Sequence, residues 1–119
     1  MEPTVLQHYT QGQWKTPEKG SALEIHHAIH GSVHALSSTQ ELDWSEVFEY
    51  GRSIGNPALR SMTFQERGRM LKALALHLHA KREIFYAMSI ATGATRGDSW
   101  IDIEGGIGNL FSYASLRKQ

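Results

Sequence analysis

The sequence has no cysteine among its 119 residues. Disulfide bonds, metal sites with thiolate ligands and catalysis by a cysteine nucleophile within this chain are therefore excluded. It also has no dominant charge, because twelve lysines and arginines balance twelve aspartates and glutamates. A neutral chain has no net field that attracts nucleic acid or an anionic membrane surface, so we expect neither as a partner.

Long apolar runs are missing as well. No stretch approaches the roughly 20 apolar residues that a membrane helix needs, and Met1 to Thr10 lacks the basic and apolar regions of a secretory signal. We therefore expect a cytoplasmic protein without a membrane segment. Apolar residues make up 40% of the chain and charged residues 20%, which is typical of a folded globular domain.

The first forty residues have the short runs and turn residues of β-structure. The stretch from Leu6 to Trp14 contains the turn signal Gln11-Gly12, which predicts a hairpin. Two further runs, Leu23 to Ala28 and Ser32 to Leu36, flank a turn that contains glycine and predict a second hairpin. Residues 1–40 are thus expected to form a layer of hairpins.

From Leu42 onward, the apolar residues follow a helical period. Asp43 with Glu46 three residues later predicts the N-cap of a helix. This helix is predicted to end at Gly55, because glycine tolerates a left-handed conformation and Pro57 cannot continue a helix.

A longer helical pattern begins at Thr63, which has capping-box spacing with Glu66. The pattern extends to Thr92, a length of about 43 Å at 1.5 Å per residue. Gly93 is the expected C-terminal cap. A kink is predicted near Lys81, where charged residues interrupt the apolar face.

The last helix is predicted to begin near Asp98, or at Thr95 if these two residues form the cap. One apolar stripe then continues across three glycines, and it comprises Trp100, Ile103, Ile107, Leu110, Phe111 and Ala114. Hairpins followed by three to four helices predict an α+β, mostly helical fold. We expect a single domain over residues 1–119, with its helical part at 42–119.

Gly105, Gly106 and Gly108 resemble part of a phosphate-binding loop. A dinucleotide fingerprint needs a preceding strand and a third glycine, where this chain has Phe111. Glycines inside an apolar stripe instead let another backbone approach closely, at a cost of about 1 kcal/mol each relative to alanine. We therefore predict no catalytic, cofactor-binding or metal-binding residue, but an interface formed by Trp100, Ile103, Gly105, Gly106, Ile107, Gly108 and Phe111.

The remaining polar and aromatic residues are expected to have structural rather than chemical roles. His26, His30 and His34 share strand parity and could bind a metal ion, but a turn separates them and a solvated hairpin is expected. Asp98 and Asp102 lie in the first turns of a helix, where acids act as caps. The aromatic residues are expected mainly in the core, among them Trp14, Trp44, Trp100, Phe64, Phe85 and Phe111.

Four stretches match the order of motifs in one known enzyme family. His8 to Trp14 resembles the opening motif of aldehyde dehydrogenases, Ala28 to Val33 resembles a following turn, and Met62 to Leu78 resembles their first long helix. The stretch from Ala91 to Leu116 is similar to the members that act on CoA-linked semialdehydes in phenylacetate degradation, including the aldehyde dehydrogenase half of the bifunctional ring-opening enzymes.

The resemblance implies the N-terminal segment of such an enzyme. Complete members oxidise an aldehyde through a cysteine thiolate and transfer the hydride to NAD or NADP, with residues that lie beyond the matched stretches. This chain is therefore expected to be an incomplete domain without catalysis or a cofactor of its own. Its expected partner is the rest of an aldehyde dehydrogenase chain, or a second copy in a homo-oligomer. The alternatives are a self-sufficient, non-enzymatic interaction or dimerisation module and a small metal-binding protein.

Overall fold

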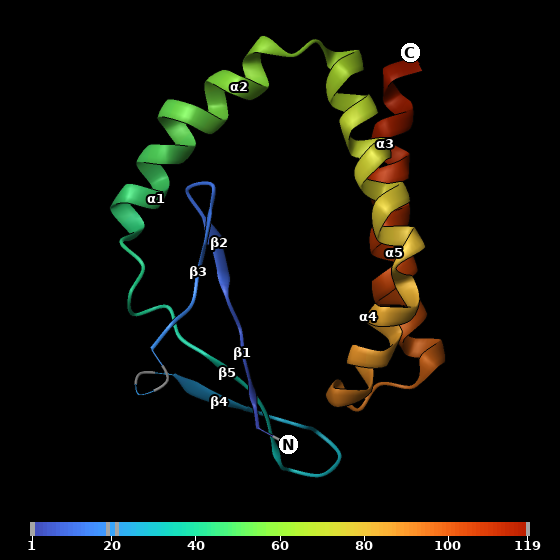
Figure 1. The fold of residues 1–119 in the computed structure, drawn as a ribbon. Helices are drawn as coiled ribbons and strands as arrows, with labels where there is room; N and C mark the ends of the chain where they lie inside the picture. The colour runs from blue at the N-terminus through green and yellow to red at the C-terminus, as the bar shows by residue number, and fades with distance from the viewer. Residues whose placement is uncertain (1, 19, 21, 119) are drawn as a thin grey trace. The chain divides into compact units, whose positions relative to one another are not determined.

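The computed structural model describes residues 2–18, 20 and 22–118 (Figure 1). The chain forms two compact units, Met1–Ala58 and Leu59–Gln119. The α+β, mostly helical fold class is confirmed. In chain order the elements are β1 (Thr4–Val5), β2 (His8–Thr10), β3 (Gln13–Lys15), β4 (Leu23–His26), β5 (Val33–Ser37), α1 (Trp44–Tyr50), η2 (Gly51–Gly55), α2 (Asn56–Ser61), α3 (Phe64–Ala80), α4 (Arg82–Ser89), η3 (Ile90–Thr92), α5 (Arg96–Ser115) and η4 (Leu116–Lys118).

The hairpin predicted at Gln11-Gly12 is confirmed. Strands β2 and β3 pair antiparallel, with Tyr9 opposite Trp14. Gln11 and Gly12 have φ angles of 54° and 76°, the two positive values of the turn whose twist matches that of a hairpin. The rings of Tyr9 and Trp14 lie 5.1 Å apart between centroids and brace the pair across the strands.

The second predicted hairpin is also confirmed, as the antiparallel pair of β4 and β5. Its turn contains Gly31, which has a φ of 69°, a conformation that glycine adopts without steric cost. Strand β1 adds in parallel to the other side of β5, so the sheet order is β1-β5-β4. The parallel pairing was not predicted, because β1 has only two residues and shows no alternating pattern.

Helix α1 begins where the sequence predicts. The carboxylate of Asp43 accepts a hydrogen bond from the N–H of Glu46 at 3.1 Å, which satisfies one of the free donors at the helix start. Leu42, just before the cap, is one of the buried residues of the first unit. It therefore anchors the entry of the chain into α1.

The predicted helix end at Gly55 is wrong. The backbone continues in helical conformation through the π-helical turn η2 into α2. In this wide turn the N–H of Asn56 bonds to the carbonyl oxygen of Gly51, five residues back. Pro57 therefore follows a shift of register and stands in the first turn of α2, where a missing N–H costs little.

The second unit is helical, and its start and its break lie where the sequence predicts them. The side chain of Thr63 accepts from the N–H of Glu66 at 3.2 Å, and the carboxylate of Glu66 accepts from the N–H of Thr63 at 2.7 Å. This capping box opens α3. The predicted kink is present at Lys81, whose φ of −101° and ψ of 7° separate α3 from α4.

The final turn and helix also follow their local signals. Gly93 has a φ of 83° and ends η3 as the predicted left-handed cap. Helix α5 begins at Thr95, whose side chain accepts from the N–H of Asp98 at 3.2 Å. Of the two predicted starts, the one at Thr95 is therefore correct. The helix passes through its glycines without a break.

Helices α3 and α5 pack side by side, and α4 packs against α5 (Figure 1). Small residues occupy the contact, with Ala75 of α3 and Ala114 of α5 both buried. A Cβ atom placed on Gly68 would lie 2.7 Å from the Cβ of Arg117 and 3.2 Å from the carbonyl oxygen of Ala114. Gly68 is thus the glycine that this helix contact requires, which the sequence analysis missed.

We expect Gly68→Ala to lower the free energy of unfolding by about 1 kcal/mol, since overpacking costs about 2 kcal/mol and the gain in helix propensity returns about 1 kcal/mol. Gly106→Ala is the matched control, because a Cβ there meets no described heavy atom within 4 Å. The control should raise stability by up to about 1 kcal/mol. Urea denaturation followed by circular dichroism measures both, and shifts of the same sign would contradict the close approach at Gly68.

The prediction that the aromatic residues lie mainly in the core is wrong for the tryptophans and for Phe64, which is 53% exposed, while Phe85 and Phe111 are half-buried. Trp14, Trp44 and Trp100 expose 68%, 51% and 56% of their surface. On α4, Tyr86 is buried instead. In the helical unit the reason is steric, because helices that meet through alanine and glycine come too close to hold an indole between them.

Candidate interface on the helical unit

Helix α5 has an inner and an outer side. Ser99, Ile107 and Ala114 are buried where α5 packs against α3 and α4. Ile103 and Phe111 lie beside them and are half-buried. These residues hold the unit together, so part of the predicted interface stripe already has its neighbours within the chain.

The other predicted interface residues lie outside this contact. Trp100, Gly105 and Gly106 are exposed, and Gly108 is half-buried. Across the part of the chain that the structure describes, a Cβ on any of the three glycines would meet no heavy atom within 4 Å. We call the exposed residues Trp100, Ile101, Gly105, Gly106 and Tyr113 the outer surface of α5.

Large apolar side chains are exposed elsewhere in the same unit. They include Leu74, Leu76, Ile84, Met88 and Ile90. Although these residues are apolar, none of the described helices has the length and apolar content to cross a bilayer. A contiguous exposed apolar patch marks a protein or membrane contact, a ligand groove or an aggregation-prone surface.

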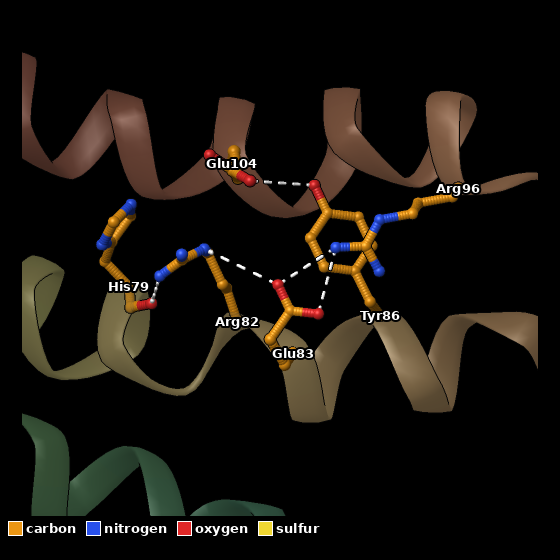
Figure 2. A network of polar contacts seen from close by, with 6 residues as sticks. All are labelled: His79, Arg82, Glu83, Tyr86, Arg96 and Glu104. Atoms are coloured by element: carbon orange, nitrogen blue, oxygen red, sulfur yellow. Dashed lines mark hydrogen bonds and ion pairs between the residues drawn. The ribbon is translucent and has the colours of Figure 1, made fainter.

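A polar network fixes α4 against α5, as Figure 2 shows. The hydroxyl of Tyr86 donates to Glu104 at 3.0 Å. The guanidinium of Arg96 lies over the ring of Tyr86, 4.2 Å from its centroid, and donates to both carboxylate oxygens of Glu83 at 3.0 Å each. The arrangement combines a cation–π contact with an ion pair in which one guanidinium nitrogen, Nη2 of Arg96, donates to both carboxylate oxygens.

The surroundings of Tyr86 keep its hydroxyl protonated. Burial raises the pKa of this phenol above its ordinary value, and the hydrogen bond to Glu104 raises it further. Tyr86 therefore acts as a fixed donor rather than as an acid or base near neutral pH. Sequence reasoning missed the network because its partners come from two helices, and no spacing within either helix indicates the pairing.

A cavity of about 340 Å³ lies beside the network, and its lining residues are Glu83, Tyr86, Ala87, Ile90, Ala94, Arg96 and Ser99. Its two charged groups, Glu83 and Arg96, pair with each other. Inside the same region the hydroxyls of Ser89 and Ser99 lie 2.7 Å apart. The polar groups of the cavity thus hold the helices together. At the start of α5 the N-cap is Thr95, and the carboxylate of Asp98 accepts a hydrogen bond from the Thr95 hydroxyl at 2.7 Å.

The structure does not bring His26, His30 and His34 together as metal ligands. Nδ1 of His26 lies 2.9 Å from the carbonyl oxygen of Gly31, and the ring of His30 stacks on that of His27. Within the described residues, no group of three or more histidine, cysteine, aspartate or glutamate side chains is placed to hold a metal ion.

Comparison with known proteins finds a similar enzyme segment. No family model matches the chain. Over 114 residues, which are 95% of the chain, it is 32% identical to the 3,4-dehydroadipyl-CoA semialdehyde dehydrogenase of Aromatoleum evansii. The chain is a homologue of part of an aldehyde dehydrogenase. The resemblance seen in the four sequence stretches is thereby confirmed.

This aldehyde dehydrogenase homologue is much shorter than its relative. The chain spans 22% of the length of the Aromatoleum evansii protein. The match covers 95% of the chain, so it includes both compact units rather than one hairpin or one helix. The outer surface of α5 therefore belongs to a region that has a counterpart in a longer protein.

Proposed function

We propose that this chain is the N-terminal structural segment of a cytoplasmic, NAD(P)-dependent aldehyde dehydrogenase that oxidises a CoA-linked semialdehyde in phenylacetate-type aromatic degradation. The observation that carries the proposal is the similarity to a CoA-semialdehyde dehydrogenase over 95% of the chain at 32% identity. The name of that relative supports the substrate class. A nicotinamide cofactor is proposed because oxidation of an aldehyde requires a hydride acceptor.

The segment itself contributes no catalytic group in this proposal. Complete aldehyde dehydrogenases of the kind this chain resembles attack the aldehyde with a cysteine thiolate, and the chain has no cysteine. The ionisable side chains Glu83, Tyr86, Arg96 and Glu104 are engaged with each other between α4 and α5. The nucleophile and the cofactor site therefore belong to the part of the enzyme without a counterpart in this chain.

The outer surface of α5 is proposed as the contact with the remainder of the aldehyde dehydrogenase. Trp100 and Ile101 supply exposed apolar area there. Gly105 and Gly106 leave open space above the helix, which another backbone can approach closely. The relative extends far beyond the matched length, so the remainder is the favoured occupant, and a second copy of the chain in a homo-oligomer is the other outcome of the test.

A segment exchange tests the proposal. We expect the Aromatoleum evansii dehydrogenase, with its homologous segment replaced by this chain, to be soluble and to retain semialdehyde oxidation, because its catalytic residues are untouched. The matched control is the same chimera with Ile107→Asp, which buries an unpaired charge and should abolish soluble expression.

The opposite result points to the stand-alone interaction module. That alternative predicts an inactive or insoluble chimera. It also predicts that the chain alone unfolds as a monomer in one cooperative transition and binds little of a dye for exposed apolar surface. Observing both would overturn the proposal, and sedimentation would then show whether the module dimerises.

A further inference from the structure

Three histidines crowd together at the tip of the β4–β5 hairpin. The ring of His27 stacks on that of His30, with centroids 4.2 Å apart and planes 18° apart. It meets the ring of His34 edge-on at 5.8 Å and 81°. His27 is half-buried, whereas His30 and His34 are exposed. Stacked imidazoles direct their nitrogen lone pairs along parallel planes, so the cluster does not have the convergent geometry of a metal site.

The turn depends on a neutral His27. Its ring nitrogen Nδ1 accepts a hydrogen bond from the N–H of Ile29 at 3.2 Å. A protonated imidazole carries hydrogen on both nitrogens and cannot accept this bond. The backbone of His27 also closes the turn, since its carbonyl accepts from Gly31 at 2.8 Å and its N–H donates to Ser32 at 2.9 Å.

The carboxylates near the three histidines lie beside His26 and His34 rather than beside His27. His27 faces the rings of His30 and His34. On β4, Glu24 pairs with His26 at 3.4 Å. Near β1, Glu2 lines a cavity together with His34. The carboxylates thus lie toward His26 and His34, while His27 has two further titratable rings as its contacts.

We propose that His27, His30 and His34 make the tip of the β4–β5 hairpin a pH-sensitive element, which is closed while His27 is neutral and opens when His27 takes up a proton. Opening removes the hydrogen bond to Ile29 and places cationic rings in contact with one another. The hairpin then changes the shape and charge of the surface that it presents.

The direction of the pH dependence follows from the surroundings of His27. Burial lowers its pKa below the ordinary value of 6.5, and the charges of His30 and His34 lower it further. Because the folded-state pKa lies below the unfolded one, the open tip binds a proton more readily than the closed tip does. The stability of the closed tip is therefore complete above pH 6.5 and is lost as the pH falls below this value toward the folded-state pKa.

Nuclear magnetic resonance of the full chain tests the proposal. Between pH 7.5 and 4.5, we expect the amide signal of Ile29 to shift with the side-chain signals of His27, at a midpoint below 6.5. His27→Asn should remove this titration and keep the turn, because an asparagine oxygen accepts from the N–H two residues on and does not titrate. His77→Asn, in α3 of the other unit, should leave it unchanged.

A second variant keeps the test independent of how well His27→Asn folds. His30→Asn removes one positive neighbour and should raise the midpoint of His27. The proposal is overturned if the Ile29 signal does not titrate, if it titrates equally in His27→Asn, or if the midpoint of His27 stays the same in His30→Asn.

Discussion

Ile107→Ala is expected to lower the free energy of unfolding of the helical unit by about 3 kcal/mol, because it leaves a cavity where a large buried side chain was removed. Ile107 is 5% exposed and lies where α5 packs against α3 and α4. The neighbouring buried positions are small, with Ala75 and Ala114 among them. Such side chains cannot move in to fill the space. Urea denaturation of the chain followed by circular dichroism measures the loss.

Ile101→Ala is the matched control for this prediction. It makes the same chemical change on the same helix, but Ile101 is 65% exposed. In a monomeric chain the control should change stability by less than about 0.5 kcal/mol. Equal losses in the two variants, with sedimentation showing a monomer, would contradict the assignment of an inner and an outer side to α5.

The structural features that could be predicted from the sequence are caps and turns, which depend on residues no more than one turn apart in the chain. The N-caps at Asp43, Thr63 and Thr95 depend on residues three positions apart, so their spacing is visible in the sequence. Gly93 and the Gln11-Gly12 turn depend on a positive φ, which few residues accept. The two hairpins and the helix boundaries after Thr63 therefore follow from local physics.

The register of α5 could not be predicted in the same way. A helical stripe that begins at Ser99 fits the period as well as one that begins at Trp100. The structure buries Ser99 and leaves Trp100 exposed. Two interactions between helices account for this: the close approach of the helices leaves no room for an indole, and the hydroxyls of Ser89 and Ser99 lie 2.7 Å apart. Neither has a signature within a single helix.

Contacts between distant segments were missed for the same reason. Gly68 is required by its approach to Ala114 and Arg117, residues that belong to the far end of the unit. The continuation past Gly55 to Pro57 depends on a π-helical turn, which no simple rule of residue preference indicates. For the candidate interface, the sequence predicts glycines that need a close neighbour, and the structure shows which of them lack one within the described chain.

Gly105→Leu is expected to affect the isolated chain and the chimeric dehydrogenase in opposite directions. In the chain alone, a Cβ at this position has no described heavy atom within 4 Å. Leucine also forms helix better than glycine, so stability should rise by about 0.8 kcal/mol. In the chimera, a backbone packed against the glycine has no room for leucine. Overpacking of about 3 kcal/mol, less the helix gain of about 0.8 kcal/mol, then lowers the ratio of folded to unfolded protein about 40-fold.

Ala73→Leu on α3 separates this effect from the mere addition of an apolar side chain. Ala73 is exposed and lies outside the proposed interface, so its substitution should be tolerated both in the chain and in the chimera. A chimera that retains activity with Gly105→Leu would show that no backbone approaches this glycine. Destabilisation of a monomeric chain by Gly105→Leu would instead show that the glycine packs within the chain itself. The proposed contact with the remainder of the dehydrogenase requires damage that appears only in the chimera, because the space above Gly105 is open in the chain alone.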